Sequence, residues 1–392
     1  MPGDVLSTWK AALGKSLRSL EQQHQRRTLA EVRGVDFCSN DYLGLAEHPG
    51  LREAISRAVE NASKIGGTAS RLLSGQTQGW HDLEEKFATF AGTEAALFFG
   101  SGYAANTGLL SSIVGPDDVV YSDVLNHASL IDGMRLSGAR KVIYPHLDLS
   151  ALENSLRQDA GAPWRRIIVT ESVFSMNGDV APLREMATLA EQFGAAMIVD
   201  EAHATGVHGK GGRGLAADAD ILPHVLAVVH TCGKALASAG AFVCGPGVMK
   251  DYLINHARTF IFSTALPPYF AEQIGEALKL AAEMDLERQT LLKHAKELSH
   301  AFRRAGFDTD GSASQIVPVV LGSNQDTLEA AEHLQRNGFA VRAIRPPTVP
   351  QGKARLRFSL TARIPEEQLH RSVKSVVEWR DSRTPSIAAR YA

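Results

Sequence analysis

The sequence predicts an α/β protein: a large domain with a mostly parallel central sheet flanked by helices, a smaller α+β domain at the carboxyl end, and a short amino-terminal helical segment. Two observations predict the sheet. The stretches AAMIVDEAHATG and VLAVVHTCGK are unbroken apolar runs that stop at polar and glycine residues. Runs that are apolar at every position suit strands buried on both faces of a parallel sheet. The segment between them is long enough for one crossover connection.

The length of the chain indicates two domains, and its charge balance does not indicate binding to nucleic acid or membrane. A chain of 392 residues can bury a large core and form two domains. We expect an amino-terminal segment over 1–45, the large domain over 46–285 and the small domain over 286–392. The formal net charge is −2 and the charges are interspersed. Nothing in this balance indicates a nucleic-acid or membrane surface.

Cysteine usage and hydropathy point to the cytoplasm. The three cysteines, Cys38, Cys232 and Cys244, lie in apolar runs and follow no pairing pattern, which is typical of a reducing compartment. The amino-terminal stretch lacks the continuous apolar core of a signal peptide. No stretch approaches the roughly 20 apolar residues of a membrane span. We therefore expect a soluble cytoplasmic protein.

The first elements are a helix and a glycine-rich turn. Residues 5–25 carry Trp9, Leu13, Leu17 and Leu20 on one stripe, which predicts an amphipathic helix packed on the large domain. Further on, AALFFGSGYAANTGLLSSI predicts a strand, a glycine-rich turn at 100–103 and a helix. Free backbone N–H groups at such a helix start can hold a phosphate. The glycine spacing is that of neither the dinucleotide fingerprint nor the P-loop.

Several strands end in polar residues that can carry chemistry. His127 follows one strand, Glu171 and Ser175 end another, and Asp200 and Lys234 end the two apolar runs. Parallel strands deliver their carboxyl ends to one rim of the sheet, so Asp200, His203 and Lys234 should converge there. A helix cap is the alternative for His127, and a turn hydroxyl for Ser175.

A carboxylate, an imidazole and a primary amine at one buried rim suit pyridoxal phosphate. The aldehyde of that cofactor forms a Schiff base with a lysine, and an anionic Asp stabilises its protonated ring nitrogen. A buried Asp without a cationic partner would cost roughly several kcal/mol. We therefore place Lys234 and Asp200 at the two ends of one cofactor. His203 and His208 could pair on a metal, but a third ligand in a compatible element is missing, and we expect no metal.

The carboxyl-terminal part changes pattern. A long helix over about 268–305 leads into the short strands IVPVVLG, AVRAIRP and ARLRFSL, which interleave with two helices. Arg357 alternates with apolar neighbours in the last of these strands. An arginine there suits bidentate binding of a carboxylate, and a surface ion pair is the alternative.

The motif DEAHATG followed by TCGK resembles the α-oxoamine synthases, which use pyridoxal phosphate to condense an amino acid with an acyl thioester. The resemblance runs from SNDYLGL at Ser39 to RLRFSLTA at Ala362, and it implies the aminotransferase-like fold of pyridoxal-phosphate-dependent transferases. It implies that Lys234, His127 and Asp200 are catalytic, with His127 stacked on the cofactor ring. The cofactor contacts that it implies are Gly102, Tyr103, Ser175, Asp200, His203, Thr231 and Lys234. The substrate contacts are Arg26, His127, Thr348 and Arg357.

Within that family the motif IRPPTVPQGKARLRFSLTA resembles the biotin-pathway member more than the relatives that act on glycine. This implies L-alanine and a pimeloyl thioester, carried by coenzyme A or by a carrier protein, as substrates. A glycine C-acetyltransferase or a 5-aminolevulinate synthase is the alternative within the family. A non-enzymatic binding protein on the same fold is the alternative outside it, and the retained Lys234 disfavours it.

The segment HARTFIFSTALPP is similar to one that, in relatives, crosses to the partner subunit. There it offers Ser263 or Thr264 to the cofactor phosphate of the partner. The resemblance thus implies a homodimer with shared active sites. A plain strand and proline turn is the alternative reading of the same residues.

Overall fold

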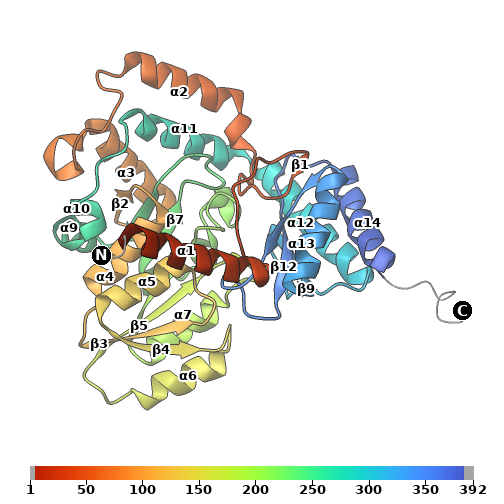
Figure 1. Ribbon diagram of the computed structural model, residues 1–392. Helices are drawn as coiled ribbons and strands as arrows, with labels where there is room; N and C mark the ends of the chain where they lie inside the picture. The colour runs from red at the N-terminus through yellow and green to blue at the C-terminus, as the bar shows by residue number, and fades with distance from the viewer. Residues whose placement is uncertain (1–4, 384–392) are drawn as a thin grey trace, which may run out of the picture.

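The large domain is built on a seven-stranded sheet. A computed structural model describes residues 5–383 (Figure 1). The strand order is β2-β8-β7-β6-β5-β3-β4; β3 to β7 run parallel, and β8 is antiparallel to both of its neighbours. The predicted mostly parallel sheet is confirmed. The strands are β2 (Ala95–Phe99), β3 (Asp118–Asp123), β4 (Arg140–Tyr144), β5 (Arg165–Glu171), β6 (Ala195–Asp200), β7 (Val225–Thr231) and β8 (Ala241–Gly245).

The strands in the middle of this sheet are buried on both faces. Neighbouring residues of β6 show this, because Met197 and Val199 pack into one apolar cluster and Ile198 packs into another on the opposite face. All three side chains are fully buried. Helices cover both faces, as the predicted crossover connections require. These helices are α3 (Gln78–Ala91), α4 (Gly102–Ile113), α5 (Ala128–Ser137), α6 (Leu149–Gln158), α7 (Leu183–Gln192), α8 (Leu215–Asp218), α9 (Gly247–His256) and α10 (Arg258–Ile261).

Two longer helices and four short turns complete this part of the chain. Helix α2 (Pro49–Asn61) packs on α11 (Tyr269–Glu283) along the upper edge in Figure 1. The short helical turns are η1 (Leu45–Glu47), the π-turn η2 (Arg71–Gly75), η3 (Lys210–Gly212) and η4 (Leu222–His224).

The small domain carries an antiparallel sheet of three strands in the order β11-β12-β9. The alternating strands predicted for this part of the chain are therefore present. A separate two-stranded ladder pairs β1 with β10 in parallel, which ties the amino-terminal segment to the small domain. The elements are β1 (Val35–Asp36), β9 (Ile316–Gly322), β10 (Phe339–Ala340), β11 (Arg342–Ile344), β12 (Ala354–Ser359), α12 (Asp285–Arg304), α13 (Asn324–Arg336) and α14 (Glu366–Arg383).

The single helix expected over about 268–305 is in fact two helices, α11 and α12. The break falls at Met284, whose φ of −92° and ψ of 48° are not helical. The Arg288 guanidinium donates to the carbonyls of Ala281 and Ala282 and so satisfies the free end of α11. Acidic residues in the first turn of α12 favour a new helix start at that point.

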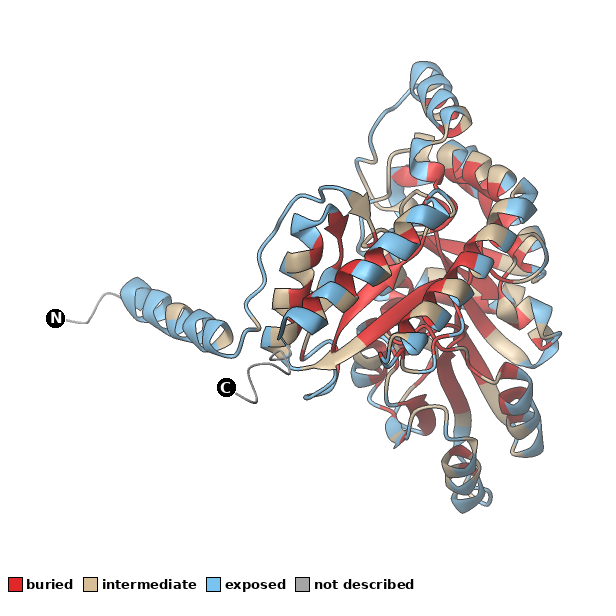
Figure 2. Ribbon diagram, turned by 90° about the vertical axis from the view of Figure 1, so that its right-hand side faces the viewer, coloured by how far each residue is buried: buried red, intermediate tan, exposed pale blue. Residues whose placement is uncertain are grey.

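Helix α1 (Val5–Gln22) is amphipathic, as its spacing predicts, but none of its residues is buried. Trp9 is 65% exposed and Leu13 is 61% exposed. Figure 2 shows the helix standing away from the body of the molecule. The expectation that it packs on the large domain is therefore wrong for the single chain. Among residues 5–383, no helix is long and apolar enough to cross a membrane.

Candidate active site

A cavity of about 380 Å³ lies at the carboxyl rim of the seven-stranded sheet, beside the start of α4. Its wall is formed by the ends of β5, β6 and β7 and by the starts of α4 and α5. The predicted convergence of strand ends is therefore present in the fold. Eight of the residues singled out in the sequence line this one cavity, namely Gly102, Tyr103, His127, Glu171, Asp200, His203, Thr231 and Lys234.

Asp200 is a buried carboxylate held by neutral donors. It ends β6 and is 4% exposed. Its Oδ1 accepts a hydrogen bond from the Ala202 backbone N–H at 2.8 Å, and its Oδ2 accepts from Asn106 Nδ2 at 2.6 Å. Within residues 5–383, no basic side chain lies within the 4.0 Å of an ion pair from it. The site therefore presents a buried anion that a cationic group of a ligand can pair with.

Lys234 follows β7 and faces the same cavity. Burial lowers the pKa of its amine to about 8, against the opposing effect of Asp200 and Glu171. An amine with this pKa is partly neutral at physiological pH, and the neutral form is the nucleophile and base.

Glu171 is a cavity residue that sequence reasoning placed on the rim but gave no role. It ends β5, directly beside Asp200 in the parallel register. Burial and the Asp200 charge raise its pKa well above the usual range, although Lys234 opposes them. Its Oε1 is buried and has no hydrogen-bond partner within the described part of the chain. The signal for it was the end of an apolar strand adjacent to β6.

His127 is both a helix cap and a cavity residue. Its Nδ1 lies 3.2 Å from the Ser129 backbone N–H, which donates to it, and 2.7 Å from Ser129 Oγ. Burial and the Lys234 charge lower its pKa, although Asp200 opposes them. The cap that was the alternative interpretation is thus real, and it fixes the ring at the cavity wall.

The start of α4 and the end of β7 meet in another part of the cavity wall. Ser101 caps the helix, because its Oγ accepts from the Ala104 backbone N–H at 3.1 Å. A Cβ on Gly102 would lie 2.7 Å from Thr231 Cγ2, so only glycine fits there without a shift. The first N–H groups of a helix have no partner within the helix and favour an anion. Gly102, Tyr103 and Thr231 therefore form a cradle of the right kind for a phosphate.

A chain of hydrogen bonds runs from the cavity through Tyr42 and Asn40 to Arg357 on β12 of the small domain. His203 Nδ1 lies 2.5 Å from Tyr42 Oη, which donates to Asn40 Oδ1 at 3.1 Å. Burial, followed by the Lys234 and Arg357 charges, lowers the pKa of His203 well below its usual range, so the ring is neutral. Asn40 and Tyr42 come from the polar turn SNDYLGL, which is therefore both a turn and part of the layer behind the cavity. His208 is engaged elsewhere, with its Nε2 3.0 Å from Gln315 Oε1.

Arg357 and Ser175 lie next to the cavity rather than in its wall. Arg357 is 8% exposed and donates through Nε to the Ser175 carbonyl at 2.7 Å. Its two terminal nitrogens each lie 3.3 Å from Asn40 Oδ1. Within the described residues no carboxylate pairs with it, so the surface ion pair considered as the alternative is not formed. Its positive charge acts on both Lys234 and His203, which places it close to the cavity.

Arg26 and Thr348 lie outside this cavity. Arg26 forms an exposed ion pair with Glu21 at 3.2 Å. The neighbouring Arg27 instead donates to Thr348 Oγ1 at 3.0 Å. Arg345 lies close enough for the Arg27 charge to help lower its pKa, after the effect of burial. The structure thus brings Arg27, and not Arg26, to the predicted substrate residue.

Comparison with known proteins places the chain in a family. The family model described as aminotransferase class I and II matches residues 32–376. The 8-amino-7-oxononanoate synthase of Geobacter sulfurreducens is 45% identical over 377 residues, which cover 95% of this chain and 96% of the relative. The chain belongs to the 8-amino-7-oxononanoate synthase family.

Solved structures of this family and of a neighbouring one share the fold. The 8-amino-7-oxononanoate synthase of Francisella tularensis is 29% identical, with a TM-score of 0.78 over 89% of this chain and 98% of that chain. A serine palmitoyltransferase holding pyridoxal phosphate as an internal aldimine is 26% identical. Its TM-score is 0.87 over 97% of this chain and 99% of that chain. The predicted aminotransferase-like fold is therefore confirmed.

Proposed function

We propose that this protein is a pyridoxal-phosphate-dependent acyltransferase that makes 8-amino-7-oxononanoate from L-alanine and a pimeloyl thioester, a step of biotin biosynthesis. The acyl group is carried by coenzyme A or by a carrier protein, and the other products are carbon dioxide and the free thiol. The observation that carries the proposal is the pairing, in one cavity, of a lysine whose pKa is lowered to about 8 with a buried carboxylate that has no cationic partner in the described chain.

The cavity residues fit the cofactor. The start of α4 and Thr231 suit the phosphate, Lys234 suits the aldehyde carbon, and Asp200 suits the ring nitrogen. Pyridoxal phosphate supplies an aldehyde that bonds to amines and a protonated ring that accepts the electron pair left by proton removal. The negative charge of Asp200 would stabilise a proton on the ring nitrogen, and hydrogen bonds from Ala202 and Asn106 fix its two oxygens in place. The neutral His203, whose ring is held by Tyr42, would contact the phenolic oxygen of the cofactor.

Lys234 acts as the proton carrier of the reaction. The free Lys234 amine would take the proton from the alanine Cα, since burial lowers the pKa of that amine to about 8. A carbon–carbon bond would then form between this Cα and the thioester carbonyl carbon, the carbon–sulfur bond would break, and the leaving thiolate would take a proton from water. Carbon dioxide leaves from the alanine carboxylate, and Lys234 returns a proton to the carbon.

Arg357 and His127 hold the alanine carboxylate in this proposal. Arg357 is a buried guanidinium without an acidic partner in the described chain, and its only bonds are to neutral oxygens. A planar guanidinium favours a carboxylate in bidentate geometry. His127 faces the cavity from the start of α5 and covers one side of it. Ser175 fixes Arg357 through its carbonyl, which supports the inclusion of Ser175 among the site residues.

The far carboxylate of the pimeloyl group is proposed to bind near Thr348. Arg27 contacts Thr348, and Arg345 lies nearby, so two positive charges gather there. Arg26 is engaged with Glu21. We therefore propose Arg27 for the role expected of Arg26.

We further propose a cytoplasmic homodimer with shared active sites. Helix α1 presents an uncovered apolar stripe, and Phe262 is 71% exposed. Ser263 and Thr264 are exposed and lie outside the cavity of their own chain, which suits a role in the active site of a partner. The three cysteines are free thiols, in keeping with a reducing compartment. The division at 1–45, 46–285 and 286–392 is also retained as a proposal.

A thioester screen tests the function. The purified, cofactor-loaded protein is mixed with L-alanine, glycine or L-serine and with acyl thioesters of different lengths, and the released thiol is followed. We expect the fastest release with L-alanine and a pimeloyl thioester, with one carbon dioxide per thiol. Faster turnover of glycine with an acetyl or succinyl thioester would instead support a glycine C-acetyltransferase or a 5-aminolevulinate synthase.

A further inference from the structure

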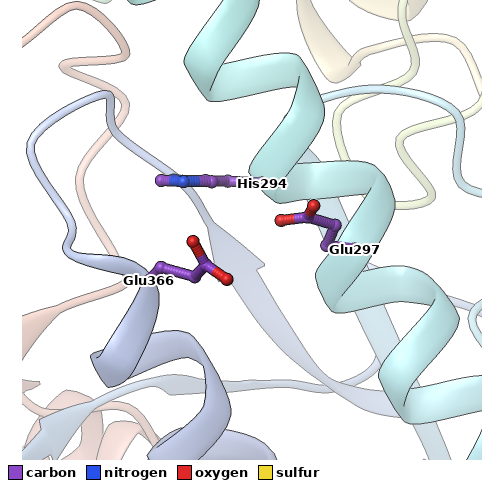
Figure 3. A group of neighbouring side chains, drawn as sticks. All are labelled: His294, Glu297 and Glu366. Atoms are coloured by element: carbon purple, nitrogen blue, oxygen red, sulfur yellow. The ribbon is translucent and has the colours of Figure 1, made fainter.

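A second group of chemically reactive side chains lies in the small domain. His294 and Glu297 are three residues apart on α12, a spacing that puts both on one face of the helix. Glu366 begins α14 and reaches the same place. Figure 3 shows the three side chains converging on one space. One ring nitrogen of His294 and one oxygen of each carboxylate all lie within 4.8 Å of one another.

Polar atoms of this group are buried without partners. His294 is 9% exposed, and its Nδ1 has no hydrogen-bond partner within residues 5–383. Glu297 Oε2 is buried and likewise unpartnered among those residues. The other oxygen of Glu297 forms an ion pair with the exposed Lys293, whose Nζ lies 3.8 Å away. In the described chain no ion pair joins His294 to either carboxylate, so a histidine–carboxylate pair does not account for the arrangement.

We infer that His294, Glu297 and Glu366 bind a divalent transition-metal ion of the zinc class. Zinc takes histidine nitrogen and carboxylate oxygen at about 2.0–2.2 Å, and three protein ligands with an open position are a common set. Two ligand atoms on one tetrahedral ion with such bonds lie roughly 3.4 Å apart. Neither His294–carboxylate pair lies within the 4.0 Å of an ion pair, so rotations of His294 and of both glutamate side chains are needed to bring the three ligand atoms onto one ion. An imidazole ligand favours zinc, copper or nickel over magnesium and calcium.

A single ion at this place would supply both the missing partners and the missing positive charge of the three side chains. It gives each of the three side chains a partner, and its two positive charges balance the two carboxylates. The ion also joins the middle of α12 to the start of α14, two helices that pack on each other. Because none of the three residues lines the cofactor cavity, the role of the ion is to stabilise the small domain. The site lies outside the proposed reaction and departs from the expectation of a metal-free protein.

Equilibrium dialysis of the chelator-treated, cofactor-loaded full chain against zinc chloride tests the inference. The variants are Glu366→Gln and His294→Gln. His300→Gln is the matched control, because His300 is an exposed histidine on the same helix. We expect one zinc per chain in the wild type and in the control, and binding at least tenfold weaker in both site variants. Zinc should raise the melting temperature of the wild type and of the control but not that of Glu366→Gln.

Cobalt absorption and magnesium competition test the ligand set and the class of metal. Cobalt(II) should give visible absorption bands in the wild type that are lost in Glu366→Gln. Because the Glu366 side chain is exposed, this substitution should leave the fold intact. A thousandfold excess of magnesium should leave bound zinc in place. Absence of zinc from the wild type, equal zinc binding in the wild type and the two site variants, or displacement by magnesium would each overturn the inference.

Discussion

Two buried clusters of acids and bases lie at the carboxyl rim of the same sheet, and they differ in how far their groups satisfy one another. In the first, His146 follows β4 and lies between two carboxylates, with Nδ1 2.9 Å from Asp123 Oδ1 and Nε2 2.5 Å from Asp179 Oδ2. In the second, the described chain gives Lys234 no ion pair and Glu171 Oε1 no partner. We call the first cluster closed, because its base is held by two carboxylates although Asp179 Oδ1 has no partner in the described chain, and the second open, because its base is unpaired.

The two clusters also shift pKa values in opposite directions. Burial acts to lower the pKa of His146, but the hydrogen bonds and charges of Asp123 and Asp179 outweigh it and raise that pKa to about 9. Burial dominates at Lys234 and lowers its pKa to about 8. A closed cluster therefore keeps its base charged and stabilises the fold. An open cluster keeps its base reactive and leaves its acids for a ligand.

The largest expected effect is at the open cluster. Lys234→Ala removes the covalent anchor of the cofactor and the proton carrier, and we expect turnover to fall by at least about 10⁴-fold. The cofactor absorbance band of the covalent linkage should disappear. Lys210→Ala, at an exposed lysine, is the control and should change neither. Turnover near the wild-type rate in Lys234→Ala would exclude the assigned role.

A matched pair of substitutions tests whether the two clusters have different roles. Removal of one partner from a buried charge pair costs about 3–5 kcal/mol. For Asp123→Asn this loss should appear in the free energy of unfolding, measured by urea denaturation, with cofactor affinity retained. For Asp200→Asn it should appear as a fall of hundreds-fold or more in kcat/KM. Equal losses of fold stability in both variants would remove the distinction.

Arg355 and Arg357 repeat the contrast on one strand. Both are buried on β12, but Arg355 pairs with Asp310 at 2.8 Å, whereas Arg357 has no acidic partner in the described chain. Arg357→Lys loses the bidentate geometry, and we expect KM for alanine to rise by ten- to a hundredfold, about 1.5–3 kcal/mol. Arg355→Lys should lower the melting temperature and leave that KM unchanged. A reversed result would show that Arg357 is structural.

These contrasts also show how far the sequence could lead. The strand ends were predictable, because unbroken apolar runs mark buried parallel strands and their carboxyl ends share a rim. The shared rim alone predicts that Asp200, His203 and Lys234 converge, and they do line one cavity. The same argument places Glu171 at this rim, because Glu171 ends an apolar strand.

Other features depend on contacts between distant segments and left no local pattern. Asn106 reaches Asp200 across 94 residues, and Tyr42 reaches His203 across 161. The helix break at Met284 depends on Arg288, whose side chain turns back onto the preceding helix. The choice between Arg26 and Arg27 depended on which of them faces Thr348. Spacing alone determines none of these.

The closed cluster predicts a pH dependence of stability. Because folding raises the pKa of His146 to about 9, its contribution is fully present below the unfolded pKa of about 6.5 and is lost as the pH rises through 9. His146→Gln should therefore destabilise the fold by about 1–2 kcal/mol at pH 6, an amount reduced by partial solvent exposure, and much less at pH 10. Urea denaturation at both pH values measures this. An equal loss at both would mean that His146 acts through packing alone.

The smallest expected effect lies outside both clusters, where solvent weakens charge interactions. Arg27→Ala removes the guanidinium beside Thr348, and we expect KM for a pimeloyl thioester to rise about five- to tenfold, roughly 1 kcal/mol. Arg26→Ala, which breaks only an exposed ion pair with Glu21, should change that KM less than about twofold. Added salt should narrow the difference between the two variants, because screening acts on exposed charges. If Arg26→Ala has the larger effect instead, the pimeloyl carboxylate binds beside Arg26 and not beside Arg27 and Thr348.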